Sequence, residues 1–405
     1  MRRVKKLMRI IYFSLDYSPH DHRFLSALAN TEHEVFYVRL QRGNRQTEDR
    51  PVPARIQQVL WAGGQKPFEW RDLPRLVWDF RRLVREIKPD LVHAGPIQTC
   101  AFIAVLSGFR PVLTMSWGFD LMKDVERGRW WQFATRYTLK RSSYFTSDAN
   151  VTRDKAVAYG MDPARTVVFP WGVDLAHFSP EPRNNQPGKT EPGFSLFCNR
   201  SWEPNYGVDV LARAFVKVAQ QRPTVSLLLL GGGSQGALIR QILTTGGVLD
   251  QVSFVGQVGQ KELPRFYRMA DLYISPSHVD GSSVSLMEAL ACGLPCLVSD
   301  IPANKEWVRE QENGWLFPDG NVEALATKIL AVIEKRESLI EIGKNARRTA
   351  EEKANWPKNF EKLLAAYELV PVSARDEVIP VSARDEGTPE KSKMTNIDQE
   401  TSKHA

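Results

Sequence analysis

Short apolar runs alternate with helical patterns along the first part of the chain. The runs RIIYFSL from Arg9, EVFYVRL from Glu34 and DLVHAG from Asp90 have the length of buried strands. Between two of them, apolar residues recur at spacings of three and four from Leu73 to Ile87, which predicts a helix with one apolar stripe. Strands that alternate with helices predict a mainly parallel sheet with helices on both faces.

The alternation stops at a polar stretch and then restarts. The stretch SPEPRNNQPGKTEPG from Ser179 is rich in Pro, Gly and Asn and is typical of a linker. Strand patterns such as FSLFCNR, TVSLLLL and DLYISPS follow it, so we expect a second α/β domain. The expected organisation is an N-terminal α/β domain over 1–180, a linker over 181–193, a C-terminal domain over 194–350, a helix over 351–369 that crosses back to the first domain, and a disordered tail over 370–405 in which PVSARDE occurs twice.

Chain length and composition agree with two soluble domains. The 405 residues exceed the roughly 250–300 residues at which single cores stop growing, and 42% are hydrophobic. No apolar window reaches the roughly 20 residues that span a bilayer, and the four cysteines lack metal-type spacing, so we expect reduced thiols and a cytoplasmic location. The net charge of +7 suits phosphorylated ligands, nucleic acid or an anionic membrane equally.

A glycine-rich turn follows the strand pattern VSLLLL. Gly231, Gly233 and Gly236 fit the G-x-G-x-x-G fingerprint of dinucleotide-binding domains. Such a domain carries an acidic residue at the end of the next strand, where it holds a ribose. Here the strand pattern VSFVG is followed by Gln257 and preceded by Asp250, which argues against an NAD(P)-dependent oxidoreductase and leaves it the less favoured alternative.

Two carboxylates flank a predicted helix start in YISPSHVDGSSVSLMEALACGLPCLVSD. Asp280 precedes the helix, which begins near Ser283, and Glu288 lies eight residues beyond Asp280. A helix N-terminus offers unpaired N–H groups and the positive end of the helix dipole to a phosphate. The two carboxylates would then bind a sugar on one side and a ribose on the other. The plainer interpretation is a capping box from Ser285 to Glu288 and an ordinary turn at Asp280.

From Thr166 to Ile333 the chain closely resembles the nucleotide-sugar domain of the family 4, or group 1, retaining glycosyltransferases. The resemblance is carried by VVFPWGVDLAHFSP, LFCNRSWEPNYGVDVLARAF, FVGQV, DGSSVSLMEALACGLPCLVSD and NGWLFPDGNVEALA. It implies a GT-B fold, in which two Rossmann-like α/β/α domains face each other across a cleft. It also implies a nucleotide diphosphate sugar as co-substrate, with no cofactor and no metal ion.

The resemblance assigns roles to individual residues of this chain. Asp280 would hold hydroxyls of the donor sugar, Glu288 the ribose, and Arg200 would neutralise the diphosphate. Together with Asp120 of the first domain, these residues form the expected catalytic set. The expected donor-binding set consists of Glu288, the phosphate-binding backbone at Ser283 and Val284, a close-approach turn at Gly231 and Gly232, and the nucleobase loop at Gly256, Gln257 and Val258.

Three positions depart from the family pattern. Asp280 stands where Glu is usual, and Tyr206 stands where a Lys commonly binds phosphate, with Lys261 and Arg265 as candidate replacements for that charge. Trp117 replaces the His of a His-Gly-x-Asp segment whose Asp120 is kept. A front-side transfer can use the leaving phosphate as base, so the loss of this His does not exclude activity.

Candidate acceptor contacts lie in the first domain. They are His20, Asp21 and His22 in SPHDHRFL, which we expect to form a loop, together with His93 and Trp117. Alternatively, the loop histidines are simply surface residues and His93 is a hydrogen-bonded histidine at a strand end. The segment from Arg127 to Arg141, RGRWWQFATRYTLKR, interleaves basic and aromatic residues, which suits a peripheral membrane contact or a helix that packs its aromatics on the sheet.

The sequence therefore predicts a metal-independent, retaining glycosyltransferase of the cytoplasm or the inner membrane face. It would move a hexose-type sugar from a nucleotide diphosphate to a saccharide or lipid-linked acceptor in cell-surface glycan or glycolipid synthesis. A noncatalytic sugar-nucleotide or glycan-binding protein on the same fold is the alternative. We expect no nucleic-acid partner, because no recognition motif accompanies the basic residues.

Overall fold

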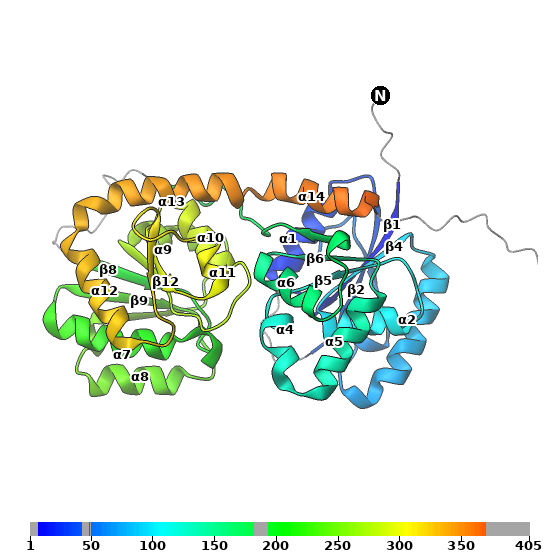
Figure 1. Ribbon diagram of the computed structural model, residues 1–405, viewed down its shortest axis with the longest axis horizontal. Helices are drawn as coiled ribbons and strands as arrows, with labels where there is room; N and C mark the ends of the chain where they lie inside the picture. The colour runs from blue at the N-terminus through cyan, green and yellow to red at the C-terminus, as the bar shows by residue number, and fades with distance from the viewer. Residues whose placement is uncertain (1–6, 43–47, 49, 182–192, 370–405) are drawn as a thin grey trace, which may run out of the picture. The chain divides into compact units, whose positions relative to one another are not determined.

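The computed structural model describes residues 7–42, 48, 50–181 and 193–369, which belong to one compact unit (Figure 1). The tail expected over 370–405 and most of the expected linker, 182–192, lie outside the described residues. Within the described part, two separate parallel sheets are each covered by helices. The α/β class expected from the sequence is thereby confirmed.

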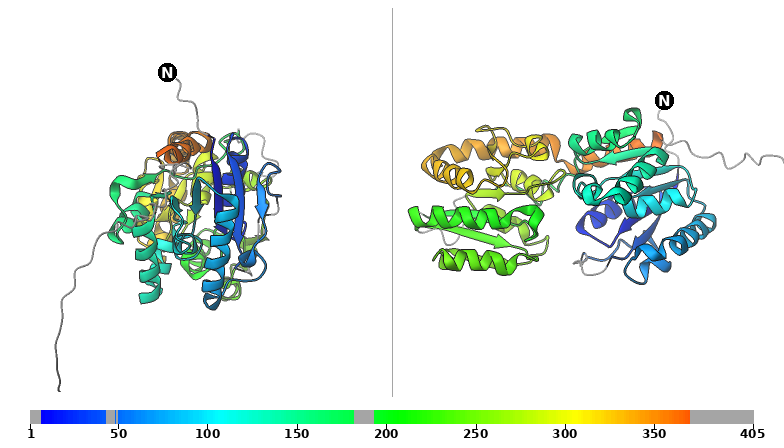
Figure 2. Two further views of the ribbon diagram at one scale, coloured as in Figure 1. Left: turned by 90° about the vertical axis from the view of Figure 1, so that its right-hand side faces the viewer. Right: turned by 60° about the horizontal axis from the view of Figure 1, so that its bottom comes forward.

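The N-terminal sheet of the described chain has seven parallel strands in the order β3-β2-β1-β4-β5-β6-β7. The strands are β1 (Arg9–Leu15), β2 (Glu34–Leu40), β3 (Gln57–Val59), β4 (Leu91–Ala94), β5 (Val112–Met115), β6 (Tyr144–Ser147) and β7 (Thr166–Val168). The helices are α1 (Pro19–Ala29), α2 (Leu73–Ile87), α3 (Phe102–Leu106), α4 (Phe119–Met122), α5 (Arg129–Arg141) and α6 (Asn150–Ala158). Alternate residues of β1 face opposite sides: Phe13 packs with α2, and Tyr12 packs with α1. Figure 2 shows the strands and helices from two further sides.

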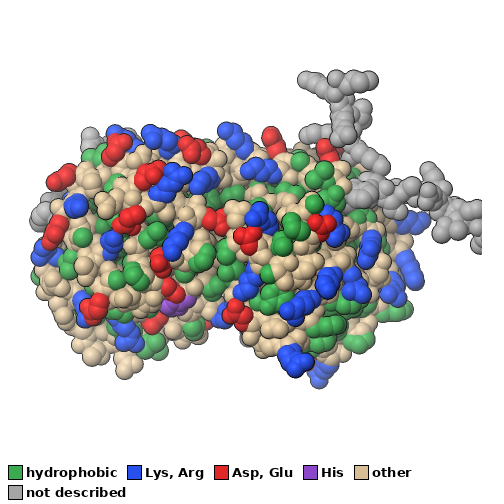
Figure 3. Space-filling model, in the orientation of Figure 1, with side chains coloured by type: hydrophobic (Ala, Val, Ile, Leu, Met, Phe, Trp, Pro, Cys, Tyr) green, Lys and Arg blue, Asp and Glu red, His purple; other side chains and the backbone are tan. Residues whose placement is uncertain are grey.

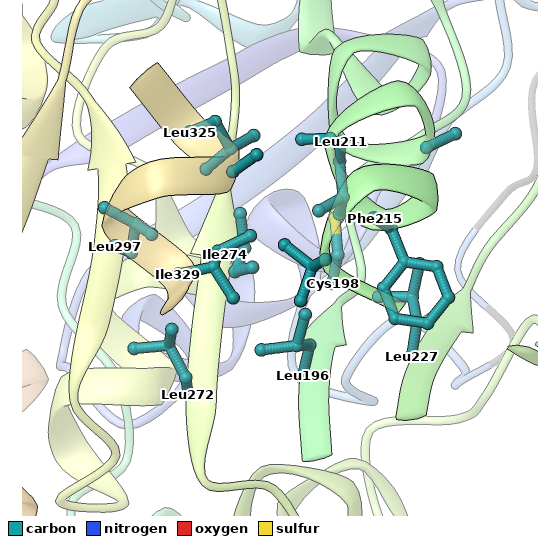
Figure 4. Close-up of a cluster of buried hydrophobic side chains, with 14 of the residues drawn as sticks. Leu196, Cys198, Leu211, Phe215, Leu227, Leu272, Ile274, Leu297, Leu325 and Ile329 are labelled. Atoms are coloured by element: carbon teal, nitrogen blue, oxygen red, sulfur yellow. The ribbon is translucent and has the colours of Figure 1, made fainter. Parts of the chain in front are cut away.

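The C-terminal sheet has six described strands in the order β10-β9-β8-β11-β12-β13. The strands are β8 (Phe194–Cys198), β9 (Val225–Leu230), β10 (Val252–Gly256), β11 (Leu272–Ser275), β12 (Cys296–Ser299) and β13 (Gly314–Phe317). The helices are α7 (Val208–Gln221), α8 (Gly236–Thr245), α9 (Leu263–Met269), α10 (Val284–Ala291), α11 (Pro302–Lys305), α12 (Val322–Glu334) and α13 (Leu339–Lys353). Figure 4 shows Leu211 and Phe215 of α7 and Ile329 of α12 pointing at strand residues such as Leu196 and Ile274.

The last described helix, α14 (Trp356–Leu369), packs on the N-terminal sheet although it follows the C-terminal domain in the chain. Its Phe360, Leu363 and Tyr367 are buried with Phe24 of α1 and Leu91 of β4. The burial of these apolar side chains stabilises the helix, because they would otherwise be exposed to water. The chain therefore crosses between the two sheets twice.

Both sheets change direction at a central strand. β1 lies between β2 and β4, and β8 lies between β9 and β11, so each sheet has a switch point where successive connections leave in opposite directions. Parallel sheets bind ligands at the carboxyl ends of the strands beside such a point. The segments that follow β1, β8, β9 and β11 are therefore the ones to inspect for a site.

Candidate donor site

Helix α10 begins where the sequence predicts, because Ser283 caps it. Ser283 has an extended backbone, and its Oγ accepts a hydrogen bond from the Leu286 amide at 3.4 Å. The capping box considered from Ser285 to Glu288 is therefore wrong: Ser285 lies inside the helix, two residues after the cap. The first amides of α10 lack partners within the helix, and they carry the positive end of its dipole.

Arg200, which follows β8, lies at this helix start. Its guanidinium donates to Ser283 Oγ at 2.7 Å, to Ser285 Oγ at 2.9 Å and to Asp280 Oδ2 at 2.5 Å. The side chains of Arg200 and Asp280 are only 10% and 18% exposed. Burial raises the pKa of Asp280, and the Arg200 charge opposes that rise. The site therefore holds a largely buried cation whose counter-ion is the Asp280 carboxylate.

Glu288 lies further along α10 and is buried. Its Oε2 accepts from the Tyr267 hydroxyl at 2.8 Å, whereas its Oε1 has no hydrogen-bond partner among the described residues. Burial raises the pKa of Glu288 to about 7, and the Tyr267 hydrogen bond and the Arg23 charge oppose this rise. A buried oxygen without a partner is unfavourable unless a ligand satisfies it, so Glu288 is suited to accept from a bound hydroxyl.

Two glycine turns adjoin each other beside these residues. Gly231, after β9, has φ +91, and its amide donates to the carbonyl of Gly256 at 2.7 Å. A Cβ at Gly233 would lie 2.6 Å from the Trp202 carbonyl, so only glycine fits there without a shift. Gly256 has φ +79 and leads to Gln257 and Val258. The segments expected to line the donor, including Gly232, are thus brought together at the ends of β9 and β10.

Asp120 occupies a different environment from the one expected of a catalytic residue. Its Oδ1 accepts from Ser116 Oγ at 2.6 Å and from the Leu121 amide at 3.0 Å, and its Oδ2 accepts from the Ile97 amide at 3.1 Å. Burial raises its pKa to about 6. Because both oxygens are used within the N-terminal domain, we assign Asp120 to holding the loop before α4. Its expected place in the catalytic set stays a prediction.

The loops that carry Trp117 and Asp280 touch each other. Gly118 has φ +80, and a Cβ there would lie 3.1 Å from the Gly281 amide. Next to this contact, the buried Asp148 at the end of β6 accepts from the Ser282 amide at 2.8 Å, and its carbonyl accepts from Ser282 Oγ at 2.6 Å. Burial raises the pKa of Asp148 to about 8. Asp148 was not among the predicted site residues, although it stands at the carboxyl end of a predicted strand.

The segment SPHDHRFL is a helix start and not a loop. The Ser18 amide donates to Asp21 Oδ2 at 2.8 Å, and the Asp21 amide donates to Ser18 Oγ at 3.3 Å, which makes a capping box for α1. Pro19 takes the first helical position, where its missing N–H has no effect. The loop expectation was wrong because this Ser-Pro-x-Asp signal was not used. Asp21 also accepts from the Tyr12 hydroxyl at 3.1 Å and is buried.

The other acceptor candidates do not form one cluster. The rings of His20 and Trp117 lie 5.4 Å apart, and burial with the Arg23 charge lowers the pKa of His20 to about 3. His22 Nδ1 lies 2.9 Å from Ser26 Oγ on α1. His93 is buried with its Nδ1 2.7 Å from the Tyr367 hydroxyl, which favours the interpretation as a hydrogen-bonded histidine. Of the acceptor candidates, His20 and Trp117 are the pair whose rings lie near each other.

A cavity of about 1170 Å³ lies between α1 and α14. His22 and Arg23 line it on one side, Trp356 on another, and Lys261 on the C-terminal side. Arg23 also donates to the Gly172 carbonyl at 2.7 Å. Of the two expected replacement cations, Lys261 lines this cavity and Arg265 is exposed on α9.

The basic and aromatic segment forms α5 and exposes part of its aromatic surface. Trp130 is 46% and Phe133 is 50% exposed, while Trp130 also meets Phe102 edge to face. The guanidinium of Arg141 lies 3.7 Å from the centre of the Tyr137 ring. Figure 3 shows Lys and Arg side chains interspersed with hydrophobic ones on the N-terminal domain. In the part of the chain that the structure describes, no helix has both the length and the apolar character to cross a bilayer.

Comparisons with known proteins agree with this arrangement. The family described as Glycosyl transferases group 1 matches residues 180–349, and the Glycosyl transferase 4-like domain matches residues 19–172. Phosphatidyl-myo-inositol mannosyltransferase of Mycobacterium leprae is 32% identical over 215 residues, 51% of this chain and 54% of that protein. The chain thus spans about half the length of this curated relative. A GDP-mannose-dependent alpha-(1-6)-phosphatidylinositol monomannoside mannosyltransferase of Mycobacterium tuberculosis is 25% identical over 70% of this chain and 77% of its own.

Solved structures show the same fold at low sequence identity. Sucrose-phosphate synthase from Thermosynechococcus elongatus superposes with a TM-score of 0.75 at 18% identity, covering 89% of this chain and 98% of that one. HepE from Anabaena, in complex with UDP and glucose, gives a TM-score of 0.72 at 18% identity over 90% of this chain and 100% of that one. The two family matches together cover most of the chain, and the fold of these neighbours covers 89% and 90% of it. The chain belongs to the group 1 glycosyltransferases and has the GT-B fold.

Proposed function

We propose that the protein is a retaining glycosyltransferase that moves a hexose-type sugar from a nucleotide diphosphate to a saccharide or lipid-linked acceptor. The observation that carries the proposal is the buried Arg200, held between Asp280 and two hydroxyls at the capped start of α10. A departing diphosphate needs preorganised positive charge, which Arg200 and the N-terminus of α10 supply. Glu288, with its unpartnered Oε1, supports a nucleoside contact on the same helix.

The donor would lie along α10 from its first turn towards Glu288. Asp280 binds hydroxyls of the sugar, the amides at Ser283 and Val284 bind the distal phosphate, and Glu288 binds the ribose. The turns at Gly231 and Gly256 leave room for the nucleobase. Among the proteins that resemble this chain, one relative is named as GDP-mannose-dependent and HepE was solved with UDP-glucose, so these two nucleotide sugars are the first donors to test.

Transfer by front-side attack fits the groups available. The acceptor hydroxyl attacks the sugar C1 on the face that the diphosphate leaves, the C1–oxygen bond to phosphate breaks, and the leaving phosphate oxygen takes the proton. The product then has the anomeric configuration of the donor. No side-chain base is required, which agrees with the engaged oxygens of Asp120, the buried His93 and the lowered pKa of His20.

The acceptor side is proposed from the surroundings of the site. His20 and Trp117 lie on the N-terminal domain next to the loop that touches Gly281, so we assign them to acceptor contact. The relatives named above act on phosphatidylinositol or its mannoside, which supports a lipid-linked acceptor. The exposed Trp130 and Phe133 among the arginines of α5 would then contact an anionic membrane surface, since this mixture of side chains suits the headgroup region.

Calorimetric titration tests the donor site. GDP, UDP, ADP, GDP-mannose, UDP-glucose and NAD(P) are each titrated into wild type and Glu288→Ala. We expect one nucleotide family to bind and Glu288→Ala to weaken it at least about tenfold, because a buried hydrogen-bonded carboxylate is lost. Glu323→Gln, an exposed carboxylate of the same domain paired with Lys217, is the matched control and should bind like wild type. Binding by NAD(P) alone would overturn the proposal.

Donor turnover separates an enzyme from a binding protein on the same fold. Wild type should hydrolyse its nucleotide sugar slowly without an acceptor, and NMR should show release of the sugar with the donor's anomeric configuration before mutarotation. Asp280→Asn should bind the nucleoside diphosphate but lose turnover, since the sugar is no longer held. Tight binding with no hydrolysis and no transfer to any lipid acceptor would favour the noncatalytic alternative.

A further inference from the structure

The diphosphate position contains fewer cations than its ligand requires. Among the described residues, Arg200 is the cation whose side chain is hydrogen-bonded at the start of α10. Asp280 already neutralises part of its charge. The ring of Tyr206 lies 4.3 Å from Arg200 Cζ. An aromatic ring positions a guanidinium but adds no positive charge. A diphosphate that binds here therefore needs a second cation from another segment.

Lys123 brings an ammonium group to this place from the N-terminal domain. It follows α4 directly, and its Nζ donates to Asn205 Oδ1, the residue before Tyr206. The Asn205 carbonyl in turn accepts from the His278 amide at 2.9 Å, which anchors Asn205 to the segment that leads to Asp280. Two connections thus tie Asn205 into the loops around Arg200: the chain itself through Tyr206, and the bond to His278.

We propose that Lys123 is the second phosphate-binding cation of the donor site and is supplied by the other domain. This inference rests on the function proposed above. Asn205 holds the ammonium beside the site, and the distal phosphate of the donor takes it over when it binds. Lysine suits this transfer because its flexible stem lets one point charge reach two partners. A charged phosphate oxygen is also a stronger acceptor than the neutral amide oxygen of Asn205.

The neighbouring backbone keeps Lys123 within reach. Gly118, at the start of α4, is in close contact with Gly281, the residue after Asp280. The segment from Gly118 to Lys123, which contains α4, is therefore fixed against the loop that carries Asp280. The distal phosphate is the leaving group, so an ammonium on it would stabilise the charge that develops as the C1–oxygen bond breaks. Lys123 thus acts on binding and on turnover together.

Titration of the full chain with nucleotides of different phosphate number tests Lys123. Lys123→Gln should weaken binding of the nucleoside diphosphate by about 10- to 100-fold, the usual effect of one charge-assisted hydrogen bond. Binding of the nucleoside monophosphate, which lacks the distal phosphate, should change less than about threefold, and Lys123→Arg should recover part of the loss. Lys155→Gln is the matched control, since Lys155 is a lysine of the same domain that pairs with Glu126 at 2.9 Å.

A second variant separates ligand binding from a structural role. Asn205→Ala removes the holding partner but keeps the ammonium, so diphosphate affinity should stay the same or rise. The proposed role of Lys123 is wrong if Asn205→Ala lowers the affinity for the nucleoside diphosphate as much as Lys123→Gln does. It is also wrong if Lys123→Gln binds the nucleoside diphosphate like wild type while Arg200→Ala binds it more weakly. If neither Arg200→Ala nor Glu288→Ala changes nucleotide affinity, the proposed donor site itself fails.

Discussion

At the scale of single residues, burial raises the pKa values of the two donor-site carboxylates against different opposing groups. Asp280 has a guanidinium 2.5 Å away, so the rise in its pKa through burial is opposed by a full charge. Glu288 accepts a hydrogen bond from the phenolic hydroxyl of Tyr267, and its pKa is raised to about 7 by burial. Near neutral pH, Glu288 is therefore the carboxylate whose ionisation responds to small changes, and ligand hydroxyls favour its charged form.

Glu288→Gln should stabilise the fold above pH 7 while it removes donor binding. The pKa of Glu288 is raised from 4.5 to about 7 in the folded protein. Between these values the folded chain binds more protons than the unfolded chain, so the contribution of Glu288 to stability falls as pH rises through this window. Neutral Gln removes that loss, and the variant should gain roughly 1–3 kcal/mol over wild type at pH 8. Denaturant unfolding at pH 5, 6, 7 and 8 measures the free energy of unfolding of both proteins. The same pH dependence in wild type and Glu288→Gln would contradict the prediction.

Tyr206 should matter through its ring and not through its hydroxyl. Tyr206→Ala removes the ring that lies 4.3 Å from Arg200 Cζ, and we expect donor affinity to fall by about 3- to 10-fold, in line with roughly 0.5–1.5 kcal/mol for a cation–π contact. Tyr206→Phe keeps the ring and should bind within about twofold of wild type. Calorimetric titration of both variants checks this, and equal losses in both would argue for the hydroxyl instead.

At the scale of helices and turns, capping residues and a glycine turn position the segments that form the site. Ser283 caps α10, and Ser18 with Asp21 caps α1, so local sequence fixes where each helix begins. Gly207, the residue before α7, has φ +58, and a Cβ there would collide with the Pro276 carbonyl. The turn after Tyr206 thus depends on glycine in two ways.

Gly207→Ala should lower the free energy of unfolding by at least about 2 kcal/mol, because it combines a left-handed backbone with a backbone collision. It should also weaken donor binding, since Asn205 and Tyr206 lie in the same turn. Gly259→Ala is the matched control: the described structure places nothing within 4 Å of its added Cβ. Urea unfolding of the two variants gives the comparison, and equal midpoints would show that the turn adapts.

The secondary structure can be predicted from the sequence, whereas the contacts between residues far apart in the chain cannot. Apolar spacing and capping residues are local, so the strands, α2 and the start of α10 follow from the chain itself, and the start of α1 would have followed from Ser-Pro-x-Asp. The contacts His93 to Tyr367, Asp148 to Ser282 and Lys123 to Asn205 join residues 274, 134 and 82 positions apart. No local pattern encodes such pairs, because tertiary packing decides them.

Contacts between loops of the two domains define the site at the scale of the whole molecule. Glu306, which follows α11, accepts from the Asn150 amide at 3.1 Å, from Asn150 Nδ2 at 3.0 Å and from the Val151 amide at 3.0 Å. A carboxylate at the N-terminus of α6 also interacts favourably with that helix's dipole. With the bonds of Asp148 and Lys123, these contacts make the donor site depend on both domains.

Glu306→Ala should loosen this contact without unfolding either domain. The amides of Asn150 and Val151 would lose their acceptor, so we expect their hydrogen exchange to speed up by about tenfold, equivalent to roughly 1.4 kcal/mol. Glu312→Ala, an exposed carboxylate paired with Arg309, is the control and should leave α6 unchanged. Mass-spectrometric exchange over residues 149–153 reads this out, and unchanged exchange in Glu306→Ala would contradict the capping role.

A crystal structure of the protein with its bound nucleoside diphosphate sugar tests the central claim most directly. We expect the distal phosphate to lie within hydrogen-bond distance of the Arg200 guanidinium and of the amides at Ser283 and Val284. The ribose should contact Glu288 Oε1, and the sugar should contact Asp280. A diphosphate bound at the glycines before α8, or a nucleotide lodged in the cavity between α1 and α14, would contradict it.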